Sequence, residues 1–174
     1  MTLSIHRAVL GPLENNVYFL VDDESGDSVL IDPSFEPQIQ LRLASEQGWQ
    51  LRQIWLTHGH YDHIAGAKTV SEAFFPPLPI AMHPESFEWA AAQPEMMKIG
   101  RRIDPVPRLD IPLAQGMWLD VVPNGSRKLV EVRDVSGHSP GSVLFYVPDL
   151  KIAVVGDAIF RGSVGRTDLE GSDH

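Results

Sequence analysis

Residues 57–63 read Thr57-His58-Gly59-His60-Tyr61-Asp62-His63 and place three of the seven histidines of the chain beside one aspartate. The apolar run at residues 51–56, directly before this cluster, is typical of a buried strand. His58 and His60 occupy alternate positions, which point to the same side of an extended chain. Asp62 and His63 then face a neighbouring point as a helix begins. Imidazole nitrogens and carboxylate oxygens are ligands that zinc, iron and manganese accept, so the segment predicts a metal site.

The alternative interpretation of this segment is a polar loop that caps a helix. Asp62 would then be the capping residue, and the histidines would lie in solvent. A cap requires only one acceptor, so this interpretation explains none of the three histidines in the cluster. The metal site is therefore favoured.

Two residues far along the chain, His138 and Asp157, are candidates to complete the ligand set. They lie in the segments Ser136-Gly137-His138-Ser139-Pro140-Gly141 and Gly156-Asp157-Ala158. Each lies beside glycine at the predicted end of a strand, where backbone approaches a metal closely and a side chain projects from the sheet edge. Taken singly, each would be an ordinary turn residue, but together with residues 57–63 they predict one shared site.

The composition limits the fold and the partners. A chain of 174 residues that is 43% hydrophobic can build one core but not two ordinary domains. The net charge of −9 and the lack of clustered Lys and Arg argue against a nucleic-acid partner. The chain has no cysteine, which excludes disulfides, a cysteine nucleophile, zinc fingers and iron–sulfur clusters. No signal peptide and no membrane-spanning run is visible, so we expect a cytoplasmic protein that does not bind membranes.

Short strands dominate the predicted secondary structure, and no internal repeat is visible. Helices are predicted at residues 37–47, 63–74 and 84–92. Residues 93–116 are rich in proline and predict a long loop. Strands are predicted at residues 4–10, 17–22, 28–31, 51–56, 80–82, 117–122, 129–135, 143–147 and 152–155. This order indicates a layered α/β fold with largely mixed sheets.

Three segments, THGHYDHIAG at 57–66, SGHSPGS at 136–142 and VVGDAIF at 154–160, resemble the metallo-β-lactamase superfamily, and most of all its glyoxalase II-like hydrolases. Residues 15–18 and 29–33 resemble the opening strands of that family. Residues 162–168 resemble a segment shared by the glyoxalase II-like and persulfide dioxygenase branches. The resemblance implies an αββα sandwich, with two mixed sheets flanked by helices, over residues 1–174 as a single domain.

The resemblance also implies a ligand set for two metal ions. His58, His60 and His138 would bind the first metal, Asp62 and His63 the second, and Asp157 would bridge them. Two zinc ions are expected, with iron or manganese as alternatives. The family supplies a further histidine to the second metal beyond the bridging aspartate, and the sequence ends at His174 before that position. We therefore expect a domain that lacks its C-terminal portion, and His174 is not taken as the ligand.

Two more residues take roles from the resemblance. Asp32 would hold the histidine loop by hydrogen bonds from outside the ligand set, and its alternative role is to open a turn before Pro33. Arg166 would contact the carboxylate of a glutathione-type substrate, which suits a forked cation. Its alternative is a local pair with Asp168 or Glu170.

The expected activity is hydrolysis of a small-molecule thioester, of the hydroxyacylglutathione kind, with Asp62 orienting the attacking hydroxide. A thiolate leaves readily, so the lack of an evident proton donor agrees with thioester cleavage. One alternative is a persulfide dioxygenase that holds a single iron with His58, His138 and Asp157. The other is a truncated domain with no turnover. The acyl group and the oligomeric state stay open.

Overall fold

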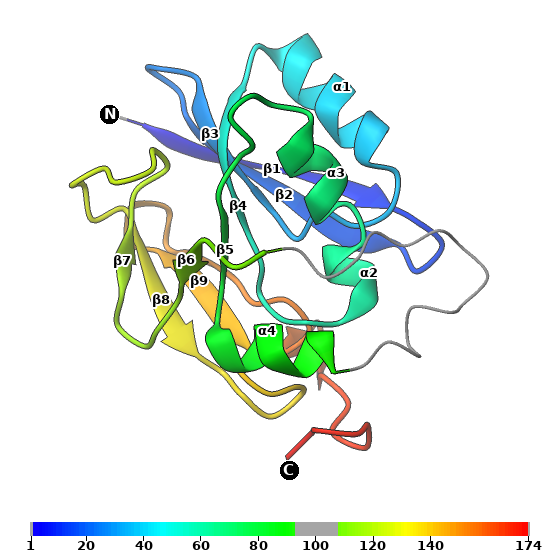
Figure 1. The fold of residues 1–174 in the computed structure, drawn as a ribbon. Helices are drawn as coiled ribbons and strands as arrows, with labels where there is room; N and C mark the ends of the chain where they lie inside the picture. The colour runs from blue at the N-terminus through cyan, green and yellow to red at the C-terminus, as the bar shows by residue number, and fades with distance from the viewer. Residues whose placement is uncertain (1, 93–107, 174) are drawn as a thin grey trace.

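The computed structural model describes residues 2–92 and 108–173, whose strands form two main sheets and one small hairpin (Figure 1). The first sheet has six strands in the order β1-β2-β3-β4-β5-β6. They are β1 (Leu3–Leu10), β2 (Asn15–Asp22), β3 (Asp27–Ile31), β4 (Gln50–Trp55), β5 (Ile80–Met82) and β6 (Ile111–Pro112). β1, β2 and β3 pair antiparallel, whereas β3 to β6 pair in parallel. This sheet is mixed, as predicted.

The second sheet differs from the expected mixed arrangement because all its pairings are antiparallel. Its four strands run in the order β10-β9-β8-β7, and β11 (Ile159–Phe160) pairs with β12 (Ser163–Val164) as a separate hairpin. The members are β7 (Trp118–Leu119), β8 (Val130–Asp134), β9 (Val143–Val147) and β10 (Ile152–Val154). Short connections join consecutive strands here, and a short connection permits only antiparallel pairing.

Four α-helices lie along the described chain: α1 (Pro37–Gln47), α2 (Tyr61–Ile64), α3 (Ala67–Glu72) and α4 (Pro84–Ala91). The single helix predicted at residues 63–74 is wrong, because Gly66 separates α2 from α3. The backbone N–H of Gly66 donates to the carbonyl of Pro33 at 2.8 Å, and a Cβ at this position would collide with the carbonyl of Ser34. The close approach of residues 33–34 therefore requires glycine here and interrupts the helix.

Two apolar clusters fill the molecule, one on each face of the first sheet. The cluster between the sheets contains Trp55 and Phe145, whose ring centroids lie 5.2 Å apart. The other cluster contains Ile54 and apolar residues from all four α-helices. Neighbouring residues of β4 thus face opposite clusters, which explains why both Ile54 and Trp55 at the end of the strand are apolar and buried. The predicted layered α/β fold, with sheets flanked by helices, is confirmed.

Arg127 connects the two sheets through buried charges. Its Nη1 lies 2.6 Å from Asp22 Oδ2 at the end of β2, and its Nη2 lies 2.6 Å from Asp120 Oδ1, just after β7. Both carboxylate side chains are only 3% exposed. This cross-sheet contact lies far from residues 57–63 and has a structural role.

The sheets also meet where the histidine segment begins. Thr57 lies just after β4. Its carbonyl accepts a hydrogen bond of 2.8 Å from the N–H of Val143, the first residue of β9. This bond ties the carboxyl end of one strand to the amino end of another, so the loops at that edge converge. Residues 93–107 of the predicted long loop lie outside the described residues. None of the helices within residues 2–92 and 108–173 is long and apolar enough to cross a bilayer.

Candidate metal centre

The predicted ligands converge at this edge from four separate segments. His58 and His60 lie on the loop after β4, and α2 carries Asp62 and His63. The turn between β8 and β9 carries His138, and Asp157 follows β10. The four imidazoles are buried, whereas Asp157 keeps 27% of its side chain exposed. The structure thus brings together all six residues predicted to bind metal: His58, His60, Asp62, His63, His138 and Asp157.

Three of the imidazoles form a first group. His58, His60 and His138 each offer one nitrogen, and these nitrogens all lie within 4.8 Å of one another. His60 Nδ1 and His138 Nε2 approach to 2.9 Å. The Nε2 atom of His58 is buried and has no hydrogen-bond partner. A buried nitrogen without a partner costs free energy unless something occupies its lone pair, and a cation would do so.

Hydrogen bonds to the far side of each ring determine which nitrogen carries the proton. His138 Nδ1 lies 2.9 Å from the carbonyl oxygen of Arg166, which only accepts, so Nδ1 donates and Nε2 is bare in the neutral ring. Thr57 Oγ1 donates to Asp32 at 2.6 Å and therefore accepts from His58 Nδ1 at 2.9 Å. The bare lone pairs of both rings thus face the common point, as metal ligands require.

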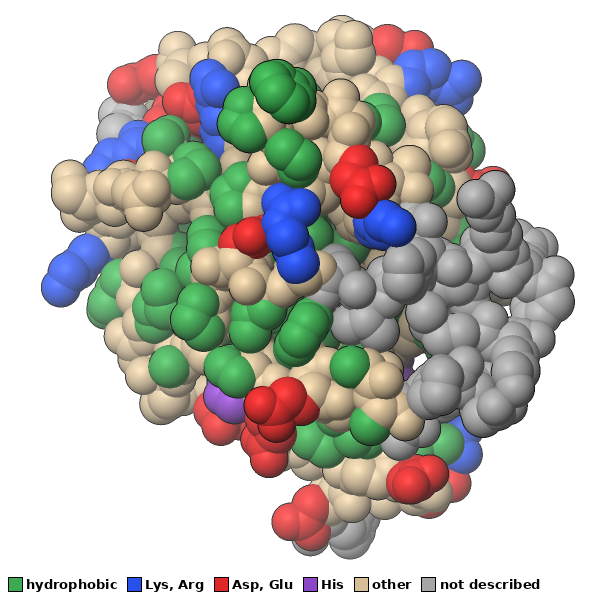
Figure 2. All heavy atoms as spheres, viewed as in Figure 1, with side chains coloured by type: hydrophobic (Ala, Val, Ile, Leu, Met, Phe, Trp, Pro, Cys, Tyr) green, Lys and Arg blue, Asp and Glu red, His purple; other side chains and the backbone are tan. Residues whose placement is uncertain are grey.

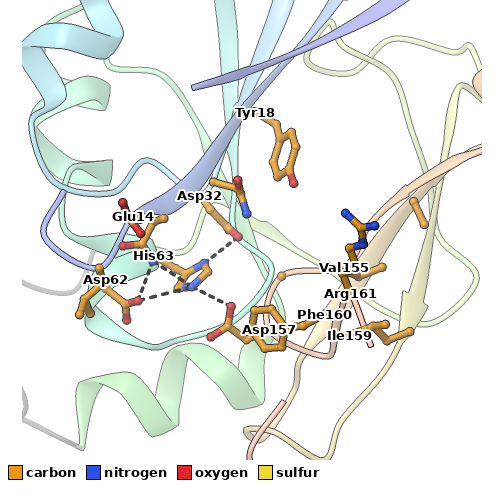
Figure 3. Close-up of a pocket in the computed structure, with 15 residues that line it drawn as sticks. Glu14, Tyr18, Asp32, Asp62, His63, Val155, Asp157, Ile159, Phe160 and Arg161 are labelled. Carbon is orange, nitrogen blue, oxygen red and sulfur yellow. Dashed lines mark hydrogen bonds and ion pairs between the residues drawn. The ribbon is translucent and has the colours of Figure 1, made fainter. Parts of the chain in front are cut away.

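A second group of ligands lies beside the first. His63 Nε2 is 3.6 Å from Asp62 Oδ2 and 3.3 Å from Asp157 Oδ1, as the dashed lines in Figure 3 show. The other oxygen of Asp157, Oδ2, lies 3.6 Å from His138 Nε2 in the first group. One carboxylate therefore directs its two oxygens toward two different ligand groups. This is the arrangement that a bridging carboxylate between two cations needs.

Asp32 hydrogen-bonds to residues beside both groups, and one of its carboxylate oxygens also lies within 4.8 Å of a nitrogen of His58 and of His63. Its Oδ1 accepts the N–H of Thr57 at 2.8 Å, and its Oδ2 accepts Thr57 Oγ1 at 2.6 Å and His63 Nδ1 at 2.9 Å. Asp32 is 1% exposed and adopts a left-handed backbone conformation with φ 51°, which Asp tolerates better than most residues. These hydrogen bonds favour one tautomer of His63 directly and one of His58 through Thr57, and the predicted role of Asp32 outside the ligand set stays a prediction.

Two glycines allow the backbone around Asp157 to approach the histidine loop. Gly156 has φ 51°, and a Cβ there would collide with Thr57 Oγ1. A Cβ at Gly165 would collide with the carbonyl oxygen of Asp157. Since both positions lack room for a side chain, the glycines beside Asp157 are part of what positions its carboxylate.

The electrostatic environment differs between the two groups. Burial, reinforced by neighbouring imidazoles, lowers the pKa of His58 well below its ordinary value. Burial and the nearby His138 lower the pKa of His60 to about 4. For His63, burial alone would lower the pKa, but hydrogen bonds to Asp157 and Asp32 outweigh it and raise the pKa well above its ordinary value. His58 and His60 are thus neutral at neutral pH, whereas the raised pKa of His63 favours its charged form among the carboxylates when no metal ion is bound.

We expect zinc binding to depend strongly on Asp32. The Asp32→Asn variant keeps the size of the side chain but loses one acceptor oxygen, so it cannot accept from the Thr57 N–H, the Thr57 hydroxyl and His63 Nδ1 together. Loss of such an outer hydrogen bond typically weakens metal binding about 10- to 100-fold. Titration of zinc against a chromophoric chelator measures the change. Asp149→Asn, an exposed change outside the centre, is the control, and equal zinc affinities in both variants would contradict the role of Asp32.

The raised pKa of His63 predicts opposite pH dependences for the metal-free and zinc-loaded chain. Protonated His63 stabilises the metal-free fold below the unfolded pKa of about 6.5, and this contribution disappears as the pH rises through the folded value. Zinc must displace that proton, so zinc affinity should instead increase over the same interval. The prediction for the metal-free fold is checked by thermal melts from neutral to alkaline pH. The unchanged chain and a His63→Gln variant are compared, both after a chelator has removed the metal. A gap in melting temperature that does not narrow with pH would contradict it.

A cavity of about 430 Å³ opens beside the second ligand group (Figure 3). Asp62, His63 and Asp157 form part of its wall, together with Tyr18 and Arg161. The cavity gives small molecules a route to the carboxylates. A substrate therefore has access to the side of the centre where Asp62 lies.

Arg166 is not among the residues that line this cavity. Its side chain forms two hydrogen bonds to Asp168, of 2.7 and 2.8 Å, on the protein surface, as in the alternative interpretation. Its backbone carbonyl instead accepts from His138, as described above. The contact between Arg166 and a substrate stays a prediction.

Sequence reasoning assigned no role to Asn15, which contacts the second ligand group. Its Nδ2 lies 2.7 Å from Asp62 Oδ2 and 3.4 Å from His63 Nε2. A polar residue at the start of an otherwise apolar strand was the available signal, but polar residues at strand ends are too common to identify one partner. Only the fold shows that β2 begins beside α2.

Comparison with known proteins agrees with this geometry. The model of the family described as the metallo-beta-lactamase superfamily matches residues 10–174. The chain belongs to this superfamily. A superfamily of metallo-hydrolases and the His/Asp cluster together indicate an enzyme that binds a divalent metal ion, whose identity they do not specify.

Two curated relatives illustrate the similarity within the superfamily. The chain is 33% identical to the probable metallo-hydrolase YqgX of Bacillus subtilis, over 96% of this chain and 76% of that protein. It is 30% identical to a hydroxyacylglutathione hydrolase of Ruegeria pomeroyi, over 88% of this chain and 51% of that protein. The chain thus spans about half the length of the second relative.

Two solved structures share the fold. The crystal structure of TTHA1623 in a di-iron-bound form is 36% identical, with a TM-score of 0.78 over 97% of this chain and 79% of that one. The structure of the BLEG-1 B3 metallo-beta-lactamase is 29% identical, with a TM-score of 0.84 over 98% of this chain and 80% of that one. Relatives with different names therefore share one fold, and the activity must be argued from the site.

Proposed function

We propose that this chain is a hydrolase that cleaves a small thioester of the hydroxyacylglutathione kind at a centre of two zinc ions. The observation that carries the proposal is the Asp157 carboxylate, whose oxygens face His63 and His138 at 3.3 and 3.6 Å. The curated hydroxyacylglutathione hydrolase at 30% identity supports the substrate class. The di-iron form of TTHA1623 makes iron the first alternative metal.

Divalent ions held by these residues would lower the pKa of water to about 7 and polarise a carbonyl group. The residues themselves orient the reactants. Asp62 lies at the cavity wall with 14% of its side chain exposed, so its carboxylate can align the attacking nucleophile. A thiolate leaves without prior protonation, so the reaction does not depend on a strong general acid in the cavity.

The surface agrees with a small-molecule substrate. On the face shown in Figure 2, Lys and Arg side chains lie apart from one another and beside acidic ones. Among the described side chains visible on this face there is no continuous basic patch for phosphate groups, and the whole chain has a net charge of −9. We therefore propose that the partner is a thioester in solution, such as a glutathione conjugate, and that the protein acts in the cytoplasm.

The test loads the metal-free chain with zinc, iron or manganese and measures three activities. S-lactoylglutathione hydrolysis is followed as released thiol, glutathione persulfide oxidation as oxygen uptake, and β-lactam hydrolysis by absorbance. The proposal expects thiol release and two metal equivalents per chain. Oxygen uptake with one iron would support the dioxygenase alternative, in which His58, His138 and Asp157 hold the metal. Bound metal without any turnover would support the alternative of an inactive domain.

A further inference from the structure

Asn15 is buried beside the second ligand group but makes no described hydrogen bond to the first. It is the first residue of β2 and is 8% exposed. Its side-chain amide donates to Asp62 Oδ2 at 2.7 Å and lies 3.4 Å from His63 Nε2. Figure 3 shows Asp62 and His63 side by side at the cavity, so this amide contacts two neighbouring ligands at once.

The chemistry of these partners requires the nitrogen side of the amide to face them. A carboxylate only accepts, so the nitrogen of the Asn15 amide must face Asp62 Oδ2. An amide NH2 group is a neutral donor with no lone pair for a metal. It can therefore hold an Asp62 oxygen without entering the coordination shell or adding charge.

The other end of the Asn15 side chain has no partner. Its Oδ1 atom is buried and accepts no hydrogen bond from the described residues. An unsatisfied buried acceptor destabilises a fold, so stabilisation of the fold alone does not explain this side chain. The contribution of the side chain is therefore its NH2 group, which faces Asp62 and His63.

We infer that Asn15 is a positioning residue that orients the Asp62 carboxylate and thereby sets the zinc affinity of the second ligand group alone. The inference rests on the proposed two-metal centre. Rotation of Asp62 would carry its oxygen away from His63. The first group is held by other contacts: Thr57 holds His58, the Arg166 carbonyl holds His138, and His138 in turn contacts His60. Replacement of Asn15 should therefore weaken metal binding at the second ligand group and leave metal binding at the first group unchanged.

The test replaces Asn15 with leucine, which has a similar size and no donor. Stepwise zinc titration against a chromophoric chelator should show the second equivalent bound about 10- to 100-fold more weakly than in the unchanged chain. The first equivalent should bind with unchanged affinity. Asn15→Ser, which restores a shorter donor, should recover part of the second affinity, and it replaces Asn15→Leu if that variant does not fold.

Gln53→Leu is the matched control, since it removes another buried amide that donates to the carbonyl of Asp120 at 2.8 Å, away from the ligands. It should lower the melting temperature and leave both zinc affinities unchanged. If Asn15→Leu weakens both equivalents or neither, the inference is overturned while the two-metal proposal stands. If the unchanged chain binds only one equivalent, both proposals are overturned.

Discussion

Replacement of His138 with alanine is expected to remove the first metal ion and nearly all turnover. His138 contributes one nitrogen to the first group and lies 3.6 Å from the carboxylate of Asp157 that would bridge the ions. A metal ion contributes several kcal/mol to the transition state, which corresponds to a loss of on the order of 10³-fold in rate. Metal content by elemental analysis and thiol release from S-lactoylglutathione measure the two effects.

His6→Ala is the control for His138→Ala, because His6 lies on β1 and packs against Trp49 with a ring separation of 4.5 Å. This variant should retain full metal content and activity. A His138→Ala chain that binds as much zinc as the His6→Ala chain would show that His138 is a buried structural histidine. The arrangement described for the first group would then not be a metal centre.

Replacement of Arg127 with methionine is expected to cause the largest loss of stability. The change leaves the carboxylates of Asp22 and Asp120 buried without their shared cation, and removal of one partner from a buried pair costs about 3–5 kcal/mol. The lower end applies, because the Arg127 side chain is itself 29% exposed. Urea unfolding of the metal-free chain at neutral pH measures the difference in free energy of unfolding.

At acid pH, the difference in free energy of unfolding between the unchanged chain and the Arg127→Met variant should become smaller. Hydrogen bonds from Arg127 lower the pKa of Asp22, and for Asp120 they outweigh the opposite effect of burial. Carboxylates with a lowered pKa stabilise the fold above their unfolded value of about 3.9 and lose that contribution as the pH falls through the folded value. Arg166→Met, at an exposed pair, should change stability little. A similar effect of both variants at neutral pH would contradict the cross-sheet role.

The histidine cluster and the strands were predictable because they depend on residues close in sequence. Histidines at alternate positions after a predicted strand indicate a strand followed by a ligand loop, and β4 lies where that strand was predicted, whereas α2 begins at Tyr61, before the predicted start at His63. The interruption of the predicted helix at Gly66 was not predictable, because it arises from contact with residues 33–34, which lie far from Gly66 in the sequence. The antiparallel second sheet, in contrast, follows from the short connections between its strands, whose lengths the predicted strand bounds already contained.

The partners of individual side chains depended on distant parts of the chain. Arg127 pairs with Asp22 across 105 residues, and Asn15 with Asp62 across 47. Local propensity reports which residues form a strand or carry metal-binding groups, because those properties depend on neighbours in sequence. Which distant side chains meet and which nitrogen of a histidine is bare depend on packing, because burial and hydrogen bonding between distant residues are properties of the folded chain.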